Sequence, residues 1–139
     1  NRVVHFLAKK ELLDTKMKWF FKGMGIIPVD RKNKNPQALQ EAIKNLNENK
    51  VIGIFPEGTT NKTNDIIMPF KYGAVKMASE TNAYIVPFSI TGEYKFFGRL
   101  KITFGEAYKI GTDLEQENKI LMNKVIDLIK GEKDEWFLL

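Results

Sequence analysis

The sequence contains no cysteine and only one histidine. The absence of cysteine excludes a disulfide framework, a thiolate nucleophile and a cysteine-based metal site, and we expect no bound metal ion. There is also no run of about 18 uninterrupted apolar residues, the length that a membrane-spanning helix requires. The N-terminal residues lack the charged, apolar and small-residue regions of a signal peptide. The sequence therefore predicts neither a spanning helix nor secretion, and its composition suits a cytosolic protein.

The overall composition is that of one ordinary globular domain. The chain has 139 residues, of which 43% are hydrophobic and 28% are charged, as in domains of mixed secondary structure. Its formal net charge of +5 favours anionic partners. These include phosphates, acidic lipid headgroups, coenzyme A, an acidic carrier protein and nucleic acid. Because the basic residues are scattered and form no dense run, we expect no nucleic-acid partner.

Short apolar runs alternate with segments of helical periodicity. This alternation indicates the α/β class, with a mixed, largely parallel sheet flanked by helices. Pro87 interrupts one strand-like run and predicts an edge, a bulge or another special geometry there. That run is expected to pair with the next one along the chain. The predicted strands cover residues 3–8, 51–55, 84–90 and 100–104, and the predicted helices cover residues 9–24, 36–46, 70–82 and 112–128.

Particular residues mark the expected helix ends. Asn35 and Pro36 form a helix-start signal, in which Asn caps the helix and Pro occupies its first turn. Gly25 is a natural stop for the preceding helix. Thr112 and Glu115 have capping-box spacing, so the last helix is expected to be capped by Thr112.

Two segments place polar groups at the ends of apolar strands: GIIPVDR at 25–31 and FPEGTTN at 55–61. Ligands of open α/β sheets bind at that edge. In the second segment, Gly58 lets the backbone approach a ligand closely. Thr59 and Thr60 add hydroxyl and backbone N–H groups. The pattern is typical of a phosphate-binding loop.

Arg31, at the end of the first segment, has the planar donor fork that suits a phosphate. Each segment also has a simpler interpretation. Residues 56–58 could form an ordinary turn, and Asp30 and Arg31 a surface ion pair. A phosphate site requires the loop and the cation to be adjacent, which the sequence only implies.

These segments resemble conserved blocks of the 1-acyl-glycerol-3-phosphate acyltransferases, the lysophosphatidate acyltransferases of the glycerolipid acyltransferase superfamily. GIIPVDR and FPEGTTN are similar to the second and third blocks of that family, and IVPFSI at 85–90 is similar to the fourth. FKYGAVKMA at 70–78 resembles the helix that follows the third block. The four segments occur in the family's order and cover most of the chain. The resemblance implies a glycerol-3-phosphate acyltransferase-like fold.

The resemblance also implies a reaction in phospholipid biosynthesis. An acyl group passes from acyl-CoA or acyl carrier protein to the 2-hydroxyl of lysophosphatidic acid, and phosphatidic acid is the product. No cofactor is implied beyond the thioester co-substrate. Because the acceptor is a lipid, a peripheral position at the cytoplasmic face of a membrane is expected. The lysines and aromatics of helix 9–24 are typical of an interfacial segment, or of a core helix with snorkelling lysines.

By this resemblance, Arg31, Glu57 and Gly58 bind the glycerol-phosphate end of the acceptor, with Thr59 and Thr60 in the same loop. Glu57 is unexpected in an anion site, because an ionised carboxylate repels phosphate. We therefore expect Glu57 to orient Arg31 or to accept hydrogen bonds from loop N–H groups.

The chain departs from the family pattern at Thr60 and Asn61, where the family has Arg and then Ser. The departure removes one cation from the loop. It either weakens phosphate binding or transfers the cationic role to Lys62 or Lys71. We expect Lys71 to take this role, because the similar helix segment includes it. Lys62 is expected to lie in solvent, as most lysines do.

Catalysis in the family depends on a His followed, after four residues, by an Asp. The His is the general base for the acceptor hydroxyl, and the Asp orients it. At that spacing the only histidine here, His5, is followed by Lys10. His5 is therefore predicted to pack in or beside the sheet, and no residue of the chain is predicted to be catalytic. Residues 1–139 are predicted to be a single partial acyltransferase domain that lacks the N-terminal catalytic segment and is inactive alone. The alternative is a non-catalytic module that binds anionic lipid or phosphate.

Overall fold

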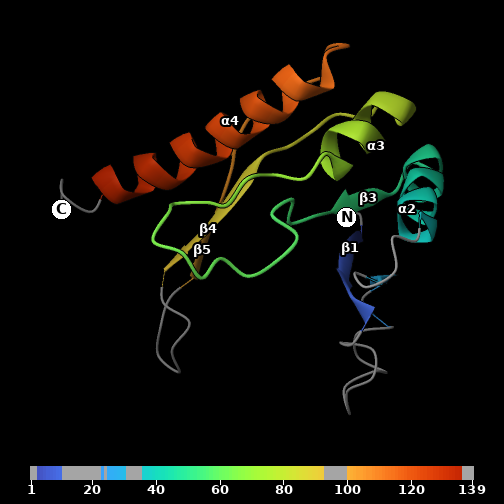
Figure 1. Ribbon diagram of the computed structural model, residues 1–139, viewed down its shortest axis with the longest axis horizontal. Helices are drawn as coiled ribbons and strands as arrows, with labels where there is room; N and C mark the ends of the chain where they lie inside the picture. Colours follow the sequence, from blue (N-terminus) through green and yellow to red (C-terminus); the bar gives the residue numbers. More distant parts are fainter. Residues whose placement is uncertain (1–2, 11–22, 24, 31–35, 93–99, 136–139) are drawn as a thin grey trace. The chain divides into compact units, whose positions relative to one another are not determined.

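The computed structural model describes residues 3–10, 23, 25–30, 36–92 and 100–135. Helices and strands alternate along these residues (Figure 1), which confirms the predicted α/β class. The chain divides into two compact units, residues 1–56 and 57–139, each with a sheet of its own. Most of the predicted helix 9–24 lies outside the described residues.

The first unit contains a parallel sheet of three strands. They are β1 (Val4–Lys9), β2 (Ile27–Val29) and β3 (Val51–Gly53), in the spatial order β2-β1-β3. The register places Leu7 opposite Ile27. Since all three strands run in the same direction, the carboxyl ends of β2 and β3 lie at the same edge of the sheet.

Strand β3 is shorter than the predicted strand 51–55. It ends at Gly53, and Phe55 lies beyond the ladder with 51% of its surface exposed. Pro56 follows directly and has no N–H to offer a neighbouring strand, which favours termination here. The Phe55 ring stacks on that of Phe6, with 6.0 Å between the ring centroids.

Helix α2 (Gln37–Asn47) packs against β2 and β3. Ala38 and Ala42, one turn apart, are its buried residues, and their small side chains let the helix approach the sheet closely. Pro36 occupies the cap position before the first turn, and its carbonyl oxygen accepts a hydrogen bond from the Gln40 N–H at 3.0 Å. The predicted cap, Asn35, lies outside the described residues.

The end of α2 is a Schellman motif that the sequence analysis does not predict. Asn49 adopts a left-handed conformation with φ of 59° and donates its N–H to the Leu46 carbonyl at 3.0 Å. The Lys50 N–H donates to the Asn45 carbonyl at 2.9 Å. Asn is the residue that most often replaces Gly in this position.

The second unit combines an antiparallel strand pair with two helices. Helix α3 (Gly73–Thr81) starts three residues later than predicted and, as predicted, ends near Asn82, which adopts a left-handed conformation. Strands β4 (Phe88–Gly92) and β5 (Leu100–Phe104) pair with each other, also as predicted, and α4 (Leu114–Glu135) packs on β4 and α3. The buried apolar side chains of this unit are Phe70, Ala74, Val75, Met77, Ala78 and Leu121.

Pro87 splits the predicted strand 84–90. Only residues from Phe88 onward join β4, whereas Ile85 forms an isolated bridge with Tyr108. Pro87 has no donor for a ladder, but its carbonyl oxygen accepts a hydrogen bond from the Gly105 N–H at 2.8 Å. The special geometry expected at this proline is therefore confirmed.

The cap of α4 differs from the prediction. Asp113, and not Thr112, caps the helix: its Oδ1 accepts hydrogen bonds from the N–H groups of Glu115 and Gln116, both at 3.1 Å. Asp and Thr are both good capping residues, so the sequence spacing alone selected the wrong neighbour. The predicted box partner Glu115 instead pairs with Lys119, one turn along the helix.

Candidate functional site: the acceptor loop

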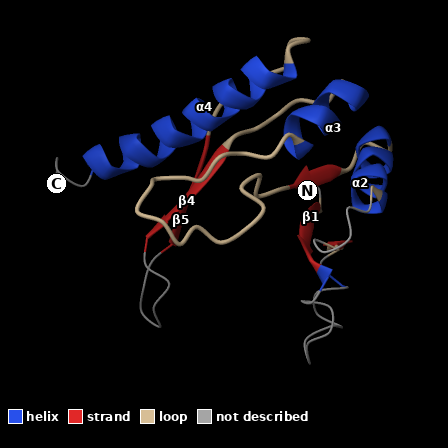
Figure 2. Cartoon of the chain, in the orientation of Figure 1, coloured by secondary structure: helices blue, strands red, loops and turns tan. Residues whose placement is uncertain are grey.

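A long connection joins β3 to α3. Residues 54–72 contain neither helix nor strand (Figure 2), and loops of this length in compact domains commonly carry function. We call this segment the acceptor loop. Arg31, which follows β2 and was predicted to join the site, lies outside the described residues. The other predicted site residues all lie in the acceptor loop: Glu57, Gly58, Thr59, Thr60 and Lys71.

The two ends of the acceptor loop meet at Gly58 and Lys71. Gly58 has a φ of +69°, in the left-handed region that favours glycine. A β-carbon at this position would lie 2.9 Å from both Cε and Nζ of Lys71. The ammonium group therefore lies directly against the backbone of the loop, and the structure brings together a glycine and a cation that are distant in sequence.

Lys71, and not Lys62, is the lysine beside Gly58. Both side chains are exposed, as are those of Thr59 and Thr60. Within the described part of the chain, neither lysine has a hydrogen bond or an ion pair. An ammonium without a carboxylate partner, placed beside accessible backbone, is available to an anion.

Glu57 closes the loop. Its Oε2 accepts a hydrogen bond from the backbone N–H of Met68 at 2.8 Å, and the contact is partly buried. Glu57 was expected either to orient Arg31 or to accept a hydrogen bond from a loop N–H group. The structure shows the second of these contacts. Because the bond joins positions far apart in the loop, it restricts the segment that leads to Lys71.

Asn61 shapes the tip of the acceptor loop. Its Oδ1 accepts hydrogen bonds from the N–H of Thr63 at 2.9 Å and from the Thr63 hydroxyl at 2.8 Å. Its Nδ2 donates to the carbonyl of Asp65 at 2.9 Å. Asn commonly builds such turns with its own side chain. From the sequence, Asn61 was noted only as a departure from the family, although an Asn two residues before a Thr is a signal for such a turn.

The residue before Lys71 is anchored in the core. Phe70 is only 7% exposed, and its carbonyl oxygen accepts a hydrogen bond from Nδ2 of Asn118 at 2.9 Å. Asn118 belongs to α4 and is not among the site residues predicted from the sequence. No local pattern could have revealed it, because the contact joins residues 48 positions apart.

The start of α3 adds positive potential next to Lys71. Its cap residue, Tyr72, makes no side-chain capping hydrogen bond, and the first turn contains no acidic residue. The unpaired N–H groups and the dipole at a helix N-terminus favour an anion. The start of α3 therefore favours a bound anion, as the Lys71 ammonium does.

His5 has a structural position in the first unit. It lies on β1, partly buried, and its Nδ1 is 3.0 Å from the carbonyl oxygen of Gly25. The acceptor is a carbonyl, so Nδ1 carries the proton in this hydrogen bond. Gly25 has a φ of +67°, and a side chain there would collide with the imidazole. The predicted role of His5 as a histidine packed beside the sheet is confirmed.

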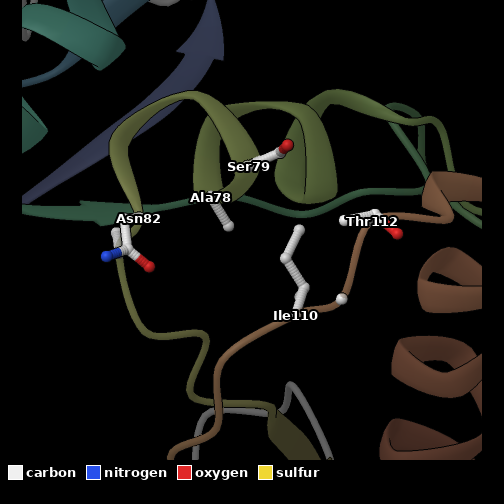
Figure 3. Close-up of a pocket in the computed structure, with 7 residues that line it drawn as sticks. Ala78, Ser79, Asn82, Ile110 and Thr112 are labelled. Atoms are coloured by element: carbon white, nitrogen blue, oxygen red, sulfur yellow. The ribbon is translucent and has the colours of Figure 1, made fainter.

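A hollow of about 430 Å³ lies at the other end of α3. Figure 3 shows Ala78 of α3 and Ile110 facing each other across it, with Asn82 and Thr112 at its rim. The hollow has no titratable residue among those that line it. Its lining offers neither a charge for an anion nor a base for a hydroxyl, and the acceptor loop remains the candidate site.

The described residues contain no cluster of three or more His, Asp or Glu side chains that could hold a metal ion. Separately, none of the described helices combines the length and the apolar character needed to cross a bilayer.

Comparison with known proteins identifies relatives of the chain. A 1-acyl-sn-glycerol-3-phosphate acyltransferase of Bacillus subtilis is 37% identical in an alignment of 111 positions, and the match covers 74% of this chain and 53% of that protein. One from Helicobacter pylori is 32% identical in an alignment of 112 positions, and the match covers 78% of this chain and 46% of that protein. The chain thus spans about half the length of these relatives.

The fold has a counterpart among solved structures. The crystal structure of the 1-acyl-sn-glycerophosphate (LPA) acyltransferase from Thermotoga maritima is similar with a TM-score of 0.72 and 23% sequence identity, over 94% of this chain and 57% of that one. A sequence model of the acyltransferase family matches residues 1–91. These residues are more than half of the chain, which therefore belongs to the acyltransferase family.

Proposed function

We propose that this chain is the acceptor-binding part of a 1-acyl-glycerol-3-phosphate acyltransferase, and that its acceptor loop binds the phosphate of lysophosphatidic acid. The observation that carries the proposal is the position of the Lys71 ammonium against the left-handed backbone of Gly58. The names of the relatives support the choice of acceptor.

In this proposal each loop residue has a separate task. Lys71 makes a charge-assisted contact with the phosphate, and Gly58 allows the phosphate to approach the backbone. The exposed hydroxyls of Thr59 and Thr60 supply further donors. Glu57 holds the loop closed through Met68 and does not touch the phosphate. Arg31 is proposed as a second cation for the same group.

The proposed reaction is a transesterification from a thioester. The 2-hydroxyl oxygen of the acceptor attacks the thioester carbonyl carbon, the new C–O bond forms and the C–S bond breaks. The hydroxyl proton passes to a general base and then to the leaving thiolate of coenzyme A or acyl carrier protein. His5 is committed to Gly25 and lacks the family's spacing to an Asp. We propose that the base comes from a part of the protein not included in these residues.

We place the protein peripherally at the cytoplasmic face of a membrane, since its proposed acceptor is a lipid and its net charge of +5 attracts anionic headgroups. Vesicle co-sedimentation with and without anionic lipid tests this position. Binding that ignores the lipid charge would contradict the electrostatic part of the proposal.

The acceptor site is tested by Lys71→Ala, with Lys130→Ala as a matched control. Calorimetric titration with a short-chain lysophosphatidate is expected to show about tenfold weaker binding for Lys71→Ala, because a hydrogen bond to a charged group contributes about 1.5–3 kcal/mol. Lys130 is an exposed residue of α4 and its replacement should leave the affinity unchanged. Equal affinity of Lys71→Ala and the unmodified protein would refute the assignment.

A gain-of-function variant tests the same site in the opposite direction. Thr60→Arg introduces a second cation into the acceptor loop at an exposed position. It is expected to tighten lysophosphatidate binding, and the gain should shrink as salt is added. The same titration with monoacylglycerol, which has no phosphate, should show no gain.

A non-catalytic lipid- or phosphate-binding module is the second candidate. It is favoured because Glu57, Gly58 and Lys71 all lie in the second unit, while no catalytic residue is assigned in the chain. The two candidates are separated by assaying the complete encoded protein with a thioester donor and lysophosphatidate. Formation of phosphatidate supports the enzyme, whereas binding without turnover supports the module.

A further inference from the structure

Asn118 makes a buried contact at the edge of the acceptor loop. It lies on α4, outside residues 1–91 that match the family model, and it is 7% exposed. Its Nδ2 donates to the carbonyl oxygen of Phe70 at 2.9 Å. That carbonyl belongs to the peptide unit joining Phe70 to Lys71. The hydrogen bond therefore restrains the peptide plane from which the proposed phosphate-binding side chain projects.

Asn118 is only partly satisfied at this position. Its Oδ1 atom is buried and has no hydrogen-bond partner among the described residues, and a buried acceptor without a partner is costly. An apolar side chain of similar volume, like that of Leu121 on the same helix, which is 4% exposed, would avoid that cost but would leave the Phe70 carbonyl without its donor. The polar side chain is therefore explained by the hydrogen bond that it gives to Phe70.

The segment before Lys71 is held at two points. Glu57 accepts the N–H of Met68 at 2.8 Å, and Asn118 donates to the carbonyl of Phe70 at 2.9 Å. The side chain of Phe70 is itself buried. With its preceding residues held from both sides, Lys71 projects from a fixed point, and its ammonium is kept over Gly58.

We propose that Asn118 is a positioning residue for acceptor binding: it orients the Phe70–Lys71 peptide so that the Lys71 ammonium stays beside Gly58. Asn118 itself touches no substrate. The inference rests on the proposed function, because the acceptor phosphate is the group that Lys71 meets. It extends the site to a helix in the part of the chain that the family model does not match.

The test replaces Asn118 by Leu in the complete encoded protein. Asn118→Leu is expected to raise the KM and the Kd for lysophosphatidate by up to about tenfold, the loss expected when the Lys71 contact itself is removed. The KM for the thioester donor and kcat should stay unchanged, because the lost contact concerns only acceptor binding. Should Asn118→Leu fail to fold, Asn118→Ala removes the same donor with a smaller side chain.

Two controls separate positioning from general stability. Asn123→Leu makes the same replacement at an exposed position of α4 and is expected to change neither KM nor Tm. Leu121→Ala weakens the same buried interface and should lower Tm without a selective change in the KM for lysophosphatidate. A KM effect of Leu121→Ala equal to that of Asn118→Leu would overturn the positioning role.

A double-mutant cycle with Lys71→Ala tests the positioning role of Asn118 separately from the proposed phosphate site. If Asn118 acts through Lys71, Asn118→Leu should cause no further loss in the Lys71→Ala background. If Lys71→Ala weakens binding but Asn118→Leu does not, or if their effects simply add, the positioning inference is wrong and the proposed function stands. If Lys71→Ala has no effect on lysophosphatidate binding, the proposed site itself is wrong.

Discussion

The Cε and Nζ atoms of Lys71 both lie 2.9 Å from the position that a β-carbon of Gly58 would occupy. The lysine thus covers the one residue at the start of the acceptor loop whose φ, +69°, is left-handed. Any side chain at Gly58 would have to displace the cation, in addition to bearing the backbone strain. The two residues therefore form one unit, and substitution of either should weaken anion binding.

Replacing Gly58 by Ala tests this unit. Gly58→Ala is expected to lower the free energy of unfolding by about 1–2 kcal/mol, because an L-residue is strained at this φ. It should also weaken lysophosphatidate binding by displacing Lys71. Gly131→Ala is the control: Gly131 lies in α4, and apart from its chain neighbours and the backbone of its own helix no atom lies within 4 Å of the added carbon, so stability should rise by roughly 0.5–1 kcal/mol. Denaturant unfolding measures the change in stability, and calorimetric titration measures the change in lysophosphatidate affinity. A Gly58→Ala variant as stable as the unmodified protein would contradict the structure.

The hydrogen bond between Glu57 and Met68 predicts that Glu57→Gln and Glu57→Ala lower the stability by different amounts. Glu57→Gln keeps an acceptor but loses its charge and should cost about 1 kcal/mol of stability, whereas Glu57→Ala leaves the Met68 N–H without a partner and should cost up to about 3 kcal/mol. Amide hydrogen exchange at Met68 should accelerate in the same order. Glu106→Gln, at an exposed position, serves as the matched control. Unchanged exchange at Met68 in Glu57→Ala would show that the bond does not close the loop.

The observed cap of α4 predicts opposite outcomes for two adjacent residues. Asp113→Ala removes the acceptor of two backbone N–H groups and should lower the free energy of unfolding by about 1 kcal/mol. Thr112→Ala should change it by less than about 0.5 kcal/mol, as surface substitutions away from such features do. Urea unfolding of the two variants decides between them, and a larger loss for Thr112→Ala would restore the capping box expected from the sequence.

Tyr108 predicts a pH dependence of stability at high pH. Burial, together with the negative charge of Glu117, raises the pKa of Tyr108 from 10.0 to about 12. Below pH 10 both the folded and the unfolded state hold the phenolic proton. Between pH 10 and about 12 only the unfolded state releases it, so the free energy of unfolding should fall as the pH rises through this window.

Tyr108→Phe should remove this part of the decline, and Tyr84→Phe, at a position 65% exposed, should retain it. Phenolate absorbance measured against pH provides a direct reading, since the signal lost in Tyr108→Phe should be the one that titrates last. An early titration of that signal would contradict the burial of the Tyr108 hydroxyl.

The order and type of most described elements could be predicted from the sequence because they follow from local periodicity. A short apolar run with β-branched and aromatic residues predicts β1, and the apolar stripe of α4 is visible in the sequence. Element ends were less well predicted. Pro87 moved the start of β4 to Phe88, and Asp113 replaced Thr112 as the cap, because several neighbouring residues satisfied the same local rule.

The acceptor loop was predictable only as a set of residue types. A glycine, hydroxyls and nearby lysines after an apolar strand indicate an anion site, and the spacing after His5 excludes the family's His-Asp pair, from the sequence alone. Only the family resemblance favoured Lys71 over Lys62. The contact of Lys71 with Gly58, the bond from Met68 to Glu57 and the bond from Asn118 to Phe70 were decided by the tertiary structure. These contacts depend on how α3 and α4 pack, and such long-range packing leaves no signature in the spacing of neighbouring residues.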